Sequence, residues 1–277
     1  MKRFLVASVF ATLPFGGAQA ADLSGQYTFV EDAYAAPAPS VVGHLEFALG
    51  WWHRQFNDVD VEQDRVRSEA RGRINIPFAG NWNLELEAGD VSLFDTDDGD
   101  VDSDVSGAVH LWAGWTGFRL GAFGAVDYTN QWIWTGGGEG EIDVGNLTLG
   151  LQGSYTDAEC PDCDFAYVVG TADFYPMPNT RLGLQGGWGD FVQISDSEWK
   201  FWNVGASAEQ RFDGTAFSLF ARADYESAVD QTLEIYSVSG GFRVFFDEAG
   251  MTLQEHDHQV PFAYKPPQIT TIFENFD

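Results

Sequence analysis

Four of the chain's few basic residues stand at alternate positions in one short stretch, RVRSEARGR. The stretch holds four arginines and one glutamate of the same parity: Arg65, Arg67, Glu69, Arg71 and Arg73. The whole chain has 14 Lys+Arg against 42 Asp+Glu, with a formal charge of −28. Alternate side chains of a β-strand point to one face. The stretch therefore predicts a strand with a cationic face, where guanidinium groups can bind carboxylates or phosphates through paired hydrogen bonds.

Alternation of apolar with polar or glycine residues recurs along the chain. In LTLGLQGSY, for example, Leu147, Leu149, Leu151 and Tyr155 share one parity. Twelve such segments are predicted as strands: 41–54, 64–76, 82–92, 105–116, 118–128, 134–144, 147–157, 165–175, 180–190, 199–211, 217–226 and 233–246. Most are close to the 9–11 residues that, as a rough guide, a tilted strand needs to cross a bilayer.

The connections between these segments also alternate. Those after the second, fourth, sixth, eighth and tenth segments are the tight turns PFAGN, TG, GN, PMPN and FDGT, and the others are mostly longer. Tryptophans stand near the segment ends, among them Trp51, Trp52, Trp112 and Trp115. An even number of strands, tight turns at one end, long loops at the other and two aromatic girdles are typical of outer-membrane barrels.

Residues 41–246 thus resemble the bacterial outer-membrane β-barrel proteins, in a porin-like architecture. The resemblance implies an all-β fold, an antiparallel transmembrane β-barrel of twelve strands, with Phe246 as the terminal aromatic of the closing strand. Fourteen strands are the alternative, if GQYTFV and QITTIF form a further pair. A soluble sandwich or lipocalin-like barrel is the other alternative, because alternation alone does not say which face meets lipid.

The ends of the chain predict export. Residues 1–20 have a basic start, an apolar run and an A-x-A site, as in a signal peptide. We expect residues 21–40 to be a periplasmic segment and residues 247–277 a periplasmic, proline-containing tail, with the barrel in the bacterial outer membrane. Expected partners are outer-membrane lipid and lipopolysaccharide, the barrel-assembly machinery and small solutes. The acidic composition argues against nucleic acid.

In a membrane barrel the charged parity must face the lumen, since an arginine facing lipid at mid-bilayer costs about 2–4 kcal/mol. The predicted lining residues are Arg54, Arg65, Arg67, Arg71, Arg73, Glu46, Glu85, Glu87, Arg119, Arg222 and Arg243. Pairing across PFAGN sets Arg73 opposite Glu85 and Arg71 opposite Glu87. Three arginines lie nearer the long loops: Arg54, Arg65 and Arg67. They have no evident acidic partner and predict a cationic patch at the mouth of the barrel.

The long loops carry other candidates. A loose calcium site is one interpretation of Asp95, Asp97, Asp100, Asp102 and Asp104, and a solvated, repulsive loop is the other. An EF-hand is disfavoured because Ser106 replaces the required glutamate. Cys160 and Cys163 predict a small loop disulfide. His256 and His258, beside Glu255, form a weak metal motif in a tail where such residues are usually exposed.

These patterns predict a porin-like channel for passive diffusion of small solutes, with anionic solutes as one option, and no cofactor apart from the calcium considered above. Glycines on the lumen parity favour an open interior. One alternative is a non-conducting structural or adhesion barrel. Another is a lipid-acting enzyme, since His44 and His110 share the lumen parity, although no G-x-S-x-G motif is present. We expect a monomer.

Overall fold

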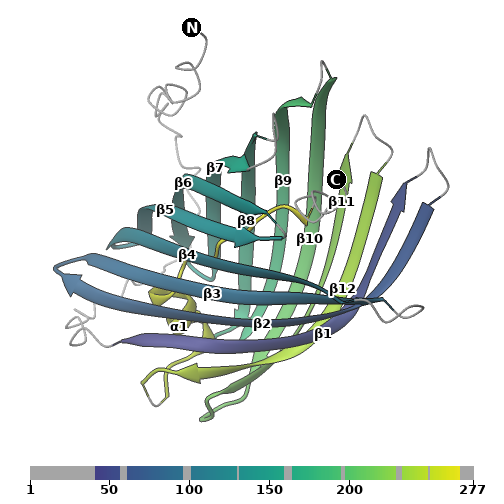
Figure 1. Ribbon diagram of the computed structural model, residues 1–277. Helices are drawn as coiled ribbons and strands as arrows, with labels where there is room; N and C mark the ends of the chain where they lie inside the picture. The colour runs from purple at the N-terminus through teal and green to yellow at the C-terminus, as the bar shows by residue number, and fades with distance from the viewer. Residues whose placement is uncertain are drawn as a thin grey trace, which may run out of the picture. The chain divides into compact units, whose positions relative to one another are not determined.

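Twelve antiparallel strands close into one barrel (Figure 1). The computed structural model describes residues 41–56, 61–95, 101–129, 131–158, 164–194, 197–228, 233–248 and 250–268. The strands are β1 (Val42–Phe56), β2 (Val61–Ala79), β3 (Trp82–Asp95), β4 (Val101–Trp115), β5 (Phe118–Tyr128), β6 (Trp132–Val144), β7 (Leu147–Ala158), β8 (Phe165–Met177), β9 (Thr180–Ile194), β10 (Ser197–Arg211), β11 (Phe217–Ala228) and β12 (Leu233–Phe246). One helix, α1 (Leu253–Gln259), follows them.

The pairing of β1 with β12 closes the barrel. It runs from Gly43 opposite Phe246 to Phe56 opposite Leu233. The twelve predicted strands are confirmed, and the closed ring leaves no free edge for a further pair. Fourteen strands are therefore the wrong alternative, although GQYTFV and most of QITTIF lie outside the described residues.

Several strands run further toward the long loops than the sequence predicts. β2 has 19 residues, and β4 begins at Val101, inside the acidic stretch expected to be a loop. Val101, Ser103 and Val105 alternate there with aspartates, so the pattern of a strand continues through it. At the other end the predicted turns are tight. Gly117 and Gly145 have φ values of 78° and 67°, a conformation that glycine adopts without strain.

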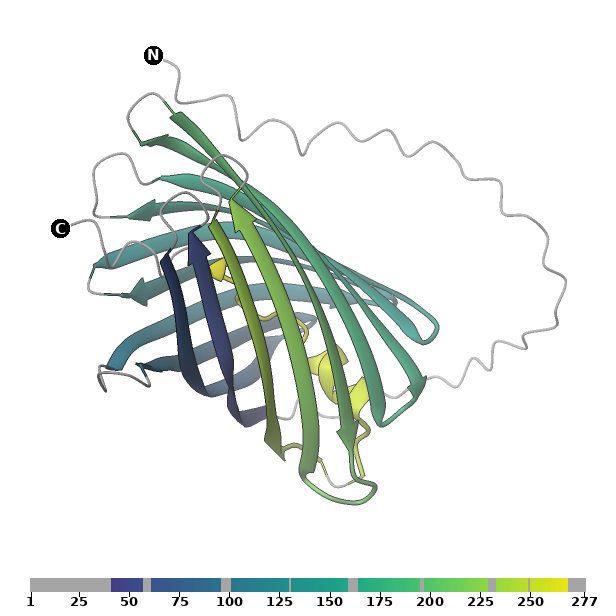
Figure 2. The ribbon, with the colours of Figure 1, turned by 90° about the vertical axis from the view of Figure 1, so that its right-hand side faces the viewer.

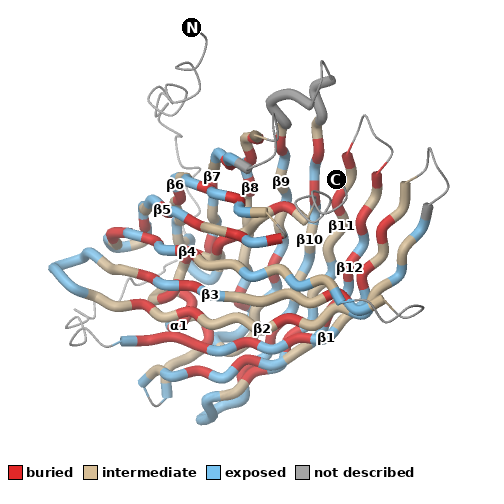
Figure 3. Tube along the Cα trace, viewed as in Figure 1, coloured by how far each residue is buried: buried red, intermediate tan, exposed pale blue. Residues whose placement is uncertain are grey.

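The apolar side chains of the barrel face outward. Leu49 and Leu184 are 68% and 65% exposed, whereas Glu85 and His110 on the inner face are 0% exposed. Figure 3 shows this alternation of exposed and buried residues along the strands. A soluble barrel would hide its leucines and expose its charges. The reversed distribution excludes the soluble alternative and identifies a surface adapted to lipid.

Aromatic residues separate into an outer and an inner set. Trp115 and Trp132 are 48% and 46% exposed at strand ends, as the girdles predict, and Trp51 is 44% exposed in the half of β1 nearer the long loop. Trp52 and Trp112, however, point inward and are nearly fully buried. Toward the long loops, inward-facing apolar side chains form one buried cluster, the mouth cluster: Trp52, Leu93, Ile133, Phe165, Tyr167, Val169, Phe201, Ala228, Leu233 and Ile235. Apolar side chains therefore narrow the lumen at this level.

Candidate functional site

Arg71 and Arg73 pair with the glutamates of β3. Arg73 Nη1 lies 3.3 Å from Glu85 Oε1, and Arg71 Nη1 lies 3.7 Å from Glu87 Oε1. The predicted register is wrong by two residues, because an irregularity at the turn places Arg73 directly opposite Glu87. The expected ion pairs therefore form diagonally across the two strands, which long side chains can do.

The arginines nearer the mouth do not form the free cationic patch that the sequence predicts. Arg65 Nη1 pairs with Asp102 Oδ2 on β4. Arg67 Nη2 lies 3.4 Å from Glu69 Oε2, and Arg54 donates a hydrogen bond to a side chain of β2. The prediction fails for Arg65 and Arg67 because β4 starts earlier than expected and carries Asp102 to the wall, while Glu69 lies on the same face of β2.

A network of ion pairs continues around the lumen. Glu46 on β1 accepts from Arg222 on β11 and from Arg243 on β12, the latter at 2.7 Å. Arg222 also reaches Glu69 at 3.3 Å, and Arg243 reaches Glu209 at 2.9 Å. Arg243 is buried and Arg222 is partly buried, and both guanidinium groups are paired with carboxylates, as removal of a charge from water requires.

The opposite side of the barrel has a smaller set of pairs. Arg119 Nε lies 3.1 Å from Glu141 Oε2, and its Nη2 lies 2.7 Å from Asp143 Oδ1. All eleven predicted lining residues lie on the inner parity of their strands. The structure brings most of them together as a paired wall.

The C-terminal segment enters the lumen enclosed by this wall from the tight-turn end of the barrel. The sequence predicts a periplasmic tail at 247–277, but residues 251–268, which we call the C-terminal plug, lie inside the barrel (Figure 2). Its helix α1 starts with a capping box in which Thr252 and Glu255 bond each other's backbone N–H groups. Leu253 is fully buried in one cluster with Tyr175 and Phe245. Among the described residues no helix is long and apolar enough to cross a membrane.

Beyond α1 the plug runs extended along β2, β3 and β5. Arg73 donates to two plug carbonyls, one of them Phe262 O at 2.5 Å. The Tyr264 backbone N–H donates to Glu87 Oε2 at 3.0 Å, and the Tyr264 hydroxyl donates to Asp127 Oδ2 at 2.5 Å. Burial raises the pKa of Tyr264 well above its ordinary value, so its hydroxyl remains a donor. The wall thus holds the plug through charge-assisted hydrogen bonds.

A buried chain of hydrogen bonds joins the base of the plug to the wall. Arg73 Nε donates to His44 Nε2 at 3.5 Å, so His44 Nδ1 carries its proton and donates to His256 Nε2 at 3.0 Å. His256 Nδ1 then donates to Asp247 Oδ2 at 3.0 Å, and Arg211 holds the same carboxylate at 2.7 and 2.9 Å. Burial lowers the pKa of His256 below its ordinary value. The chain is complete with both histidines neutral.

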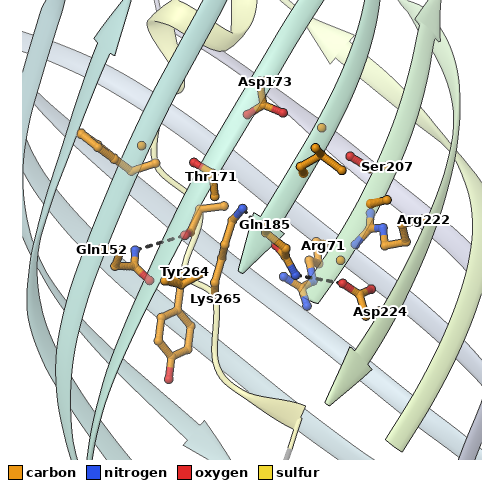
Figure 4. Close-up of a pocket in the computed structure, with 18 of the residues that line it drawn as sticks. Arg71, Gln152, Thr171, Asp173, Gln185, Ser207, Arg222, Asp224, Tyr264 and Lys265 are labelled. Atoms are coloured by element: carbon orange, nitrogen blue, oxygen red, sulfur yellow. Dashed lines mark hydrogen bonds between the residues drawn. The ribbon is translucent and has the colours of Figure 1, made fainter. Parts of the chain in front are cut away.

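A cavity of about 260 Å³ lies between the plug and the inner wall of the barrel (Figure 4). Strands β7–β11 supply most of its lining, and β1–β3, β6 and β12 supply the rest. Seven basic and seven acidic side chains line it, counting Arg and Lys against Asp and Glu. The glycines expected to leave the lumen open instead make room for side chains of neighbouring strands. The space at Gly205 is taken by Asp224, and the space at Gly187 and Gly189 is taken by Tyr167 and Phe201. The cavity is polar and balanced in charge.

The remaining predicted sites are dispersed or outside the described residues. Cys160, Cys163, Asp97 and Asp100 belong to the undescribed part of the chain, so the disulfide and the complete calcium cluster stay predictions. Asp95 ends β3, and Asp102 and Asp104 lie on β4. No group of three or more potential metal ligands occurs within the described ranges.

The histidines considered for metal binding or catalysis have other partners. His258 Nε2 lies 3.3 Å from Asp143 Oδ1, while His256 faces His44. Glu255 is occupied by the capping box. His110 Nδ1 contacts both oxygens of Glu139, at 2.9 and 3.1 Å. In the described structure no serine or cysteine bonds His44 or His110, so neither histidine has a nucleophile beside it.

Sequence reasoning missed the residues of the plug and its uncharged contacts. Tyr264, Lys265 and Gln268 belong to a proline-rich stretch that was expected to be a connector, and Gln185 is a neutral residue on β9. One signal was present. An aromatic, a lysine and a glutamine among prolines describe an extended segment with hydrogen-bonding groups, which suits a polar lumen.

Comparison with known proteins defines the class of fold. No protein-family model and no curated protein matches the chain. Solved structures do: an outer-membrane channel from Pseudomonas putida F1 has a TM-score of 0.59 and 13% identity, covering 78% of this chain and 98% of that one. The NanC porin has a TM-score of 0.52 and 11% identity, covering 72% and 98%. The chain therefore has the fold of porin-like outer-membrane β-barrels, which confirms the resemblance that the sequence indicated.

Proposed function

We propose that this protein is an outer-membrane channel for passive diffusion of small polar solutes, narrowed by its own C-terminal plug. The observation that supports it is the polar cavity between plug and wall, within a barrel whose outer face suits lipid. The likeness in fold to an outer-membrane channel and a porin supports the same function.

The ion pairs bear on which solutes pass. Charged rings set ion preference in pores when their charge is not already balanced. Arg65 and Arg67 have carboxylate partners, and the cavity lining is balanced. The geometry therefore gives little support to a general preference for anions, and we propose polar solutes of either sign.

The cellular location of the protein is part of the same proposal. The lipid-facing belt and the two aromatic girdles support the bacterial outer membrane, with the tight turns and the entry of the plug on the periplasmic side. We propose further that a signal peptide directs export and that the barrel-assembly machinery inserts the protein into the membrane. The acidic loops would contact lipopolysaccharide, with loosely bound calcium between them.

One observation favours the alternative of a non-conducting structural barrel. The mouth cluster narrows the lumen at the long-loop end, and the plug occupies part of it from the tight-turn end. Apolar constrictions can gate a pore by excluding water. We therefore propose that the described conformation is a narrow or closed state of the channel.

Planar-bilayer conductance tests the proposal. The full chain should conduct weakly, and a variant lacking residues 251–277 should conduct several times more. The matched control is Glu255→Gln, at an exposed position of the plug where glutamine also fits a capping box. This control should behave as the unmodified chain. If neither the full chain nor the shortened variant conducts at any voltage, the structural barrel is the better interpretation.

A further inference from the structure

Two oppositely charged side chains face the same cavity and are held apart by a glutamine. Lys265 Nζ on the plug donates to Gln185 Oε1 at 3.3 Å, and Gln185 Nε2 donates to Asp224 Oδ1 at 2.8 Å. All three side chains line the cavity (Figure 4). Gly205 permits this arrangement, because a Cβ there would lie 2.2 Å from the Asp224 carboxylate and 2.9 Å from Gln185.

Neither charge forms a close ion pair in the described structure. No carboxylate lies within 4.0 Å of Lys265, and no basic group lies within 4.0 Å of Asp224. From beyond that distance, Arg222 and Arg67 act on Asp224, and both are paired with Glu69. Asp173 and Glu141 act on Lys265 in the same way. This contrasts with the paired arginines of the surrounding wall. An ammonium group has three donors, and the described contacts of Lys265 use one of them.

We propose that Lys265 and Asp224 form a binding site for a small zwitterion, a molecule that carries one carboxylate and one ammonium group, as a free amino acid does. The ligand carboxylate accepts hydrogen bonds from Lys265, and the ligand ammonium donates to Asp224. Gln185 keeps the two protein charges from meeting. The proposal names the solute class of the channel proposed above and rests on that function for access to the cavity.

The balance of charge distinguishes a zwitterion from simple ions. Seven basic and seven acidic groups line the cavity. A lone anion or cation would add an uncompensated charge to this enclosed and already balanced space, which is costly. A zwitterion leaves the total unchanged and satisfies both unpaired groups. The hydroxyls of Thr171 and Ser207, which also line the cavity, add neutral hydrogen-bonding partners.

Equilibrium binding of radiolabelled glycine to the detergent-purified full chain tests the site. We expect saturable binding at one site per barrel, weakened at least about tenfold in Lys265→Met and in Asp224→Asn, since each removes a charge-assisted hydrogen bond. The matched controls are Lys200→Met, on β10 outside the cavity lining, and Asp213→Asn, in a tight turn. Both should bind glycine as the unmodified chain does. Amide exchange of Tyr264 should stay slow in Lys265→Met, which shows that the plug remains docked.

Three outcomes overturn the site: no saturable glycine binding, unchanged binding in both variants, or equal competition by acetate and methylammonium. Flux of glycine and glycerol into proteoliposomes separates the site from the channel. Binding without flux of either solute contradicts the channel and leaves the site intact. Flux of glycerol with a glycine flux that rises linearly with concentration and is unaffected by Lys265→Met contradicts the site and leaves the channel intact.

Discussion

Acidification should loosen the plug through His256. Its imidazole is fully buried and bonded on both sides, to His44 of β1 and to Asp247. The charges that face it are the carboxylates of Asp247 and Asp257, which favour protonation, and the guanidinium of Arg243, which opposes it. Protonation of His256 Nε2 would turn it from an acceptor into a donor facing the N–H donor of His44, so this hydrogen bond would break.

The direction and size of the effect follow from linkage. Burial lowers the pKa of His256 in the docked plug below its ordinary value of 6.5, so the docked state binds fewer protons than the released state. Docking is therefore fully favourable above about pH 6.5 and weakens as the pH falls toward the lowered pKa. Within this window one histidine contributes at most about 1.4 kcal/mol per pH unit, a tenfold change in the docking equilibrium.

Hydrogen exchange of the plug backbone, followed by mass spectrometry, measures this equilibrium without assuming conduction. After correction for the intrinsic pH dependence of exchange, peptides from 251–268 should open up to about fivefold more at pH 5.5 than at pH 6.5, because at pH 6.5 half of the released histidine is already protonated. His256→Gln should abolish most of this difference, while His53→Gln, at the mouth beside Asp64, should keep it. An unchanged pH response in His256→Gln would refute the assignment.

Three further substitutions test how wall and plug are held. Tyr264→Phe removes the donor to Asp127 and should weaken docking by about 1–3 kcal/mol, seen as faster exchange of the plug. Arg73→Met removes two bonds to plug carbonyls and leaves a buried β3 glutamate unpaired, so it should lower barrel stability by about 3–5 kcal/mol in urea unfolding from vesicles. Leu149→Arg puts a charge on the lipid face and should cost about 2–4 kcal/mol if it lies at mid-bilayer, whereas Asp213→Arg in a turn should cost little.

The barrel itself could be predicted because its physics is local. Lipid on one side and an ionic lumen on the other impose a period of two on every strand, and glycine at positions such as Gly117 and Gly145 marks the turns. Register was harder. A single irregularity beside the PFAGN turn shifts β2 against β3 by two residues from the predicted register, and no residue type in the turn predicts this shift. The predicted ion pair of Arg73 with Glu85 nevertheless forms, because these long side chains reach each other diagonally across the two strands.

The contents of the lumen could not be predicted because they depend on contacts across the barrel. Arg222 and Glu69 are 153 positions apart, and His44 and His256 are 212 positions apart. Near the mouth, moreover, the inner parity turns apolar, as at Phe165, and an alternation pattern does not separate that from a strand end. Whether the proline-rich tail stays outside or fills the lumen is likewise decided by wall residues far away in sequence.

The wall arginines that contact the plug do not depend on it for their ion pairs. Asp257 of the plug lies 3.0 Å from Arg181, and although burial opposes its ionisation, the charges of Arg181 and Arg243 hold the pKa of Asp257 below its ordinary value. Yet Arg181 and Arg243 also pair with Glu209, at 2.6 and 2.9 Å, and Arg73 keeps Glu85. If the plug left the lumen, these three arginines would keep their ion pairs with wall carboxylates. The plug would lose its contacts with the wall. The plug can therefore leave without separating these three arginines from their carboxylates, and the hydrogen bond to Asp127 is the contact that its departure costs. This arrangement favours a plug that opens over one that is permanently part of the barrel.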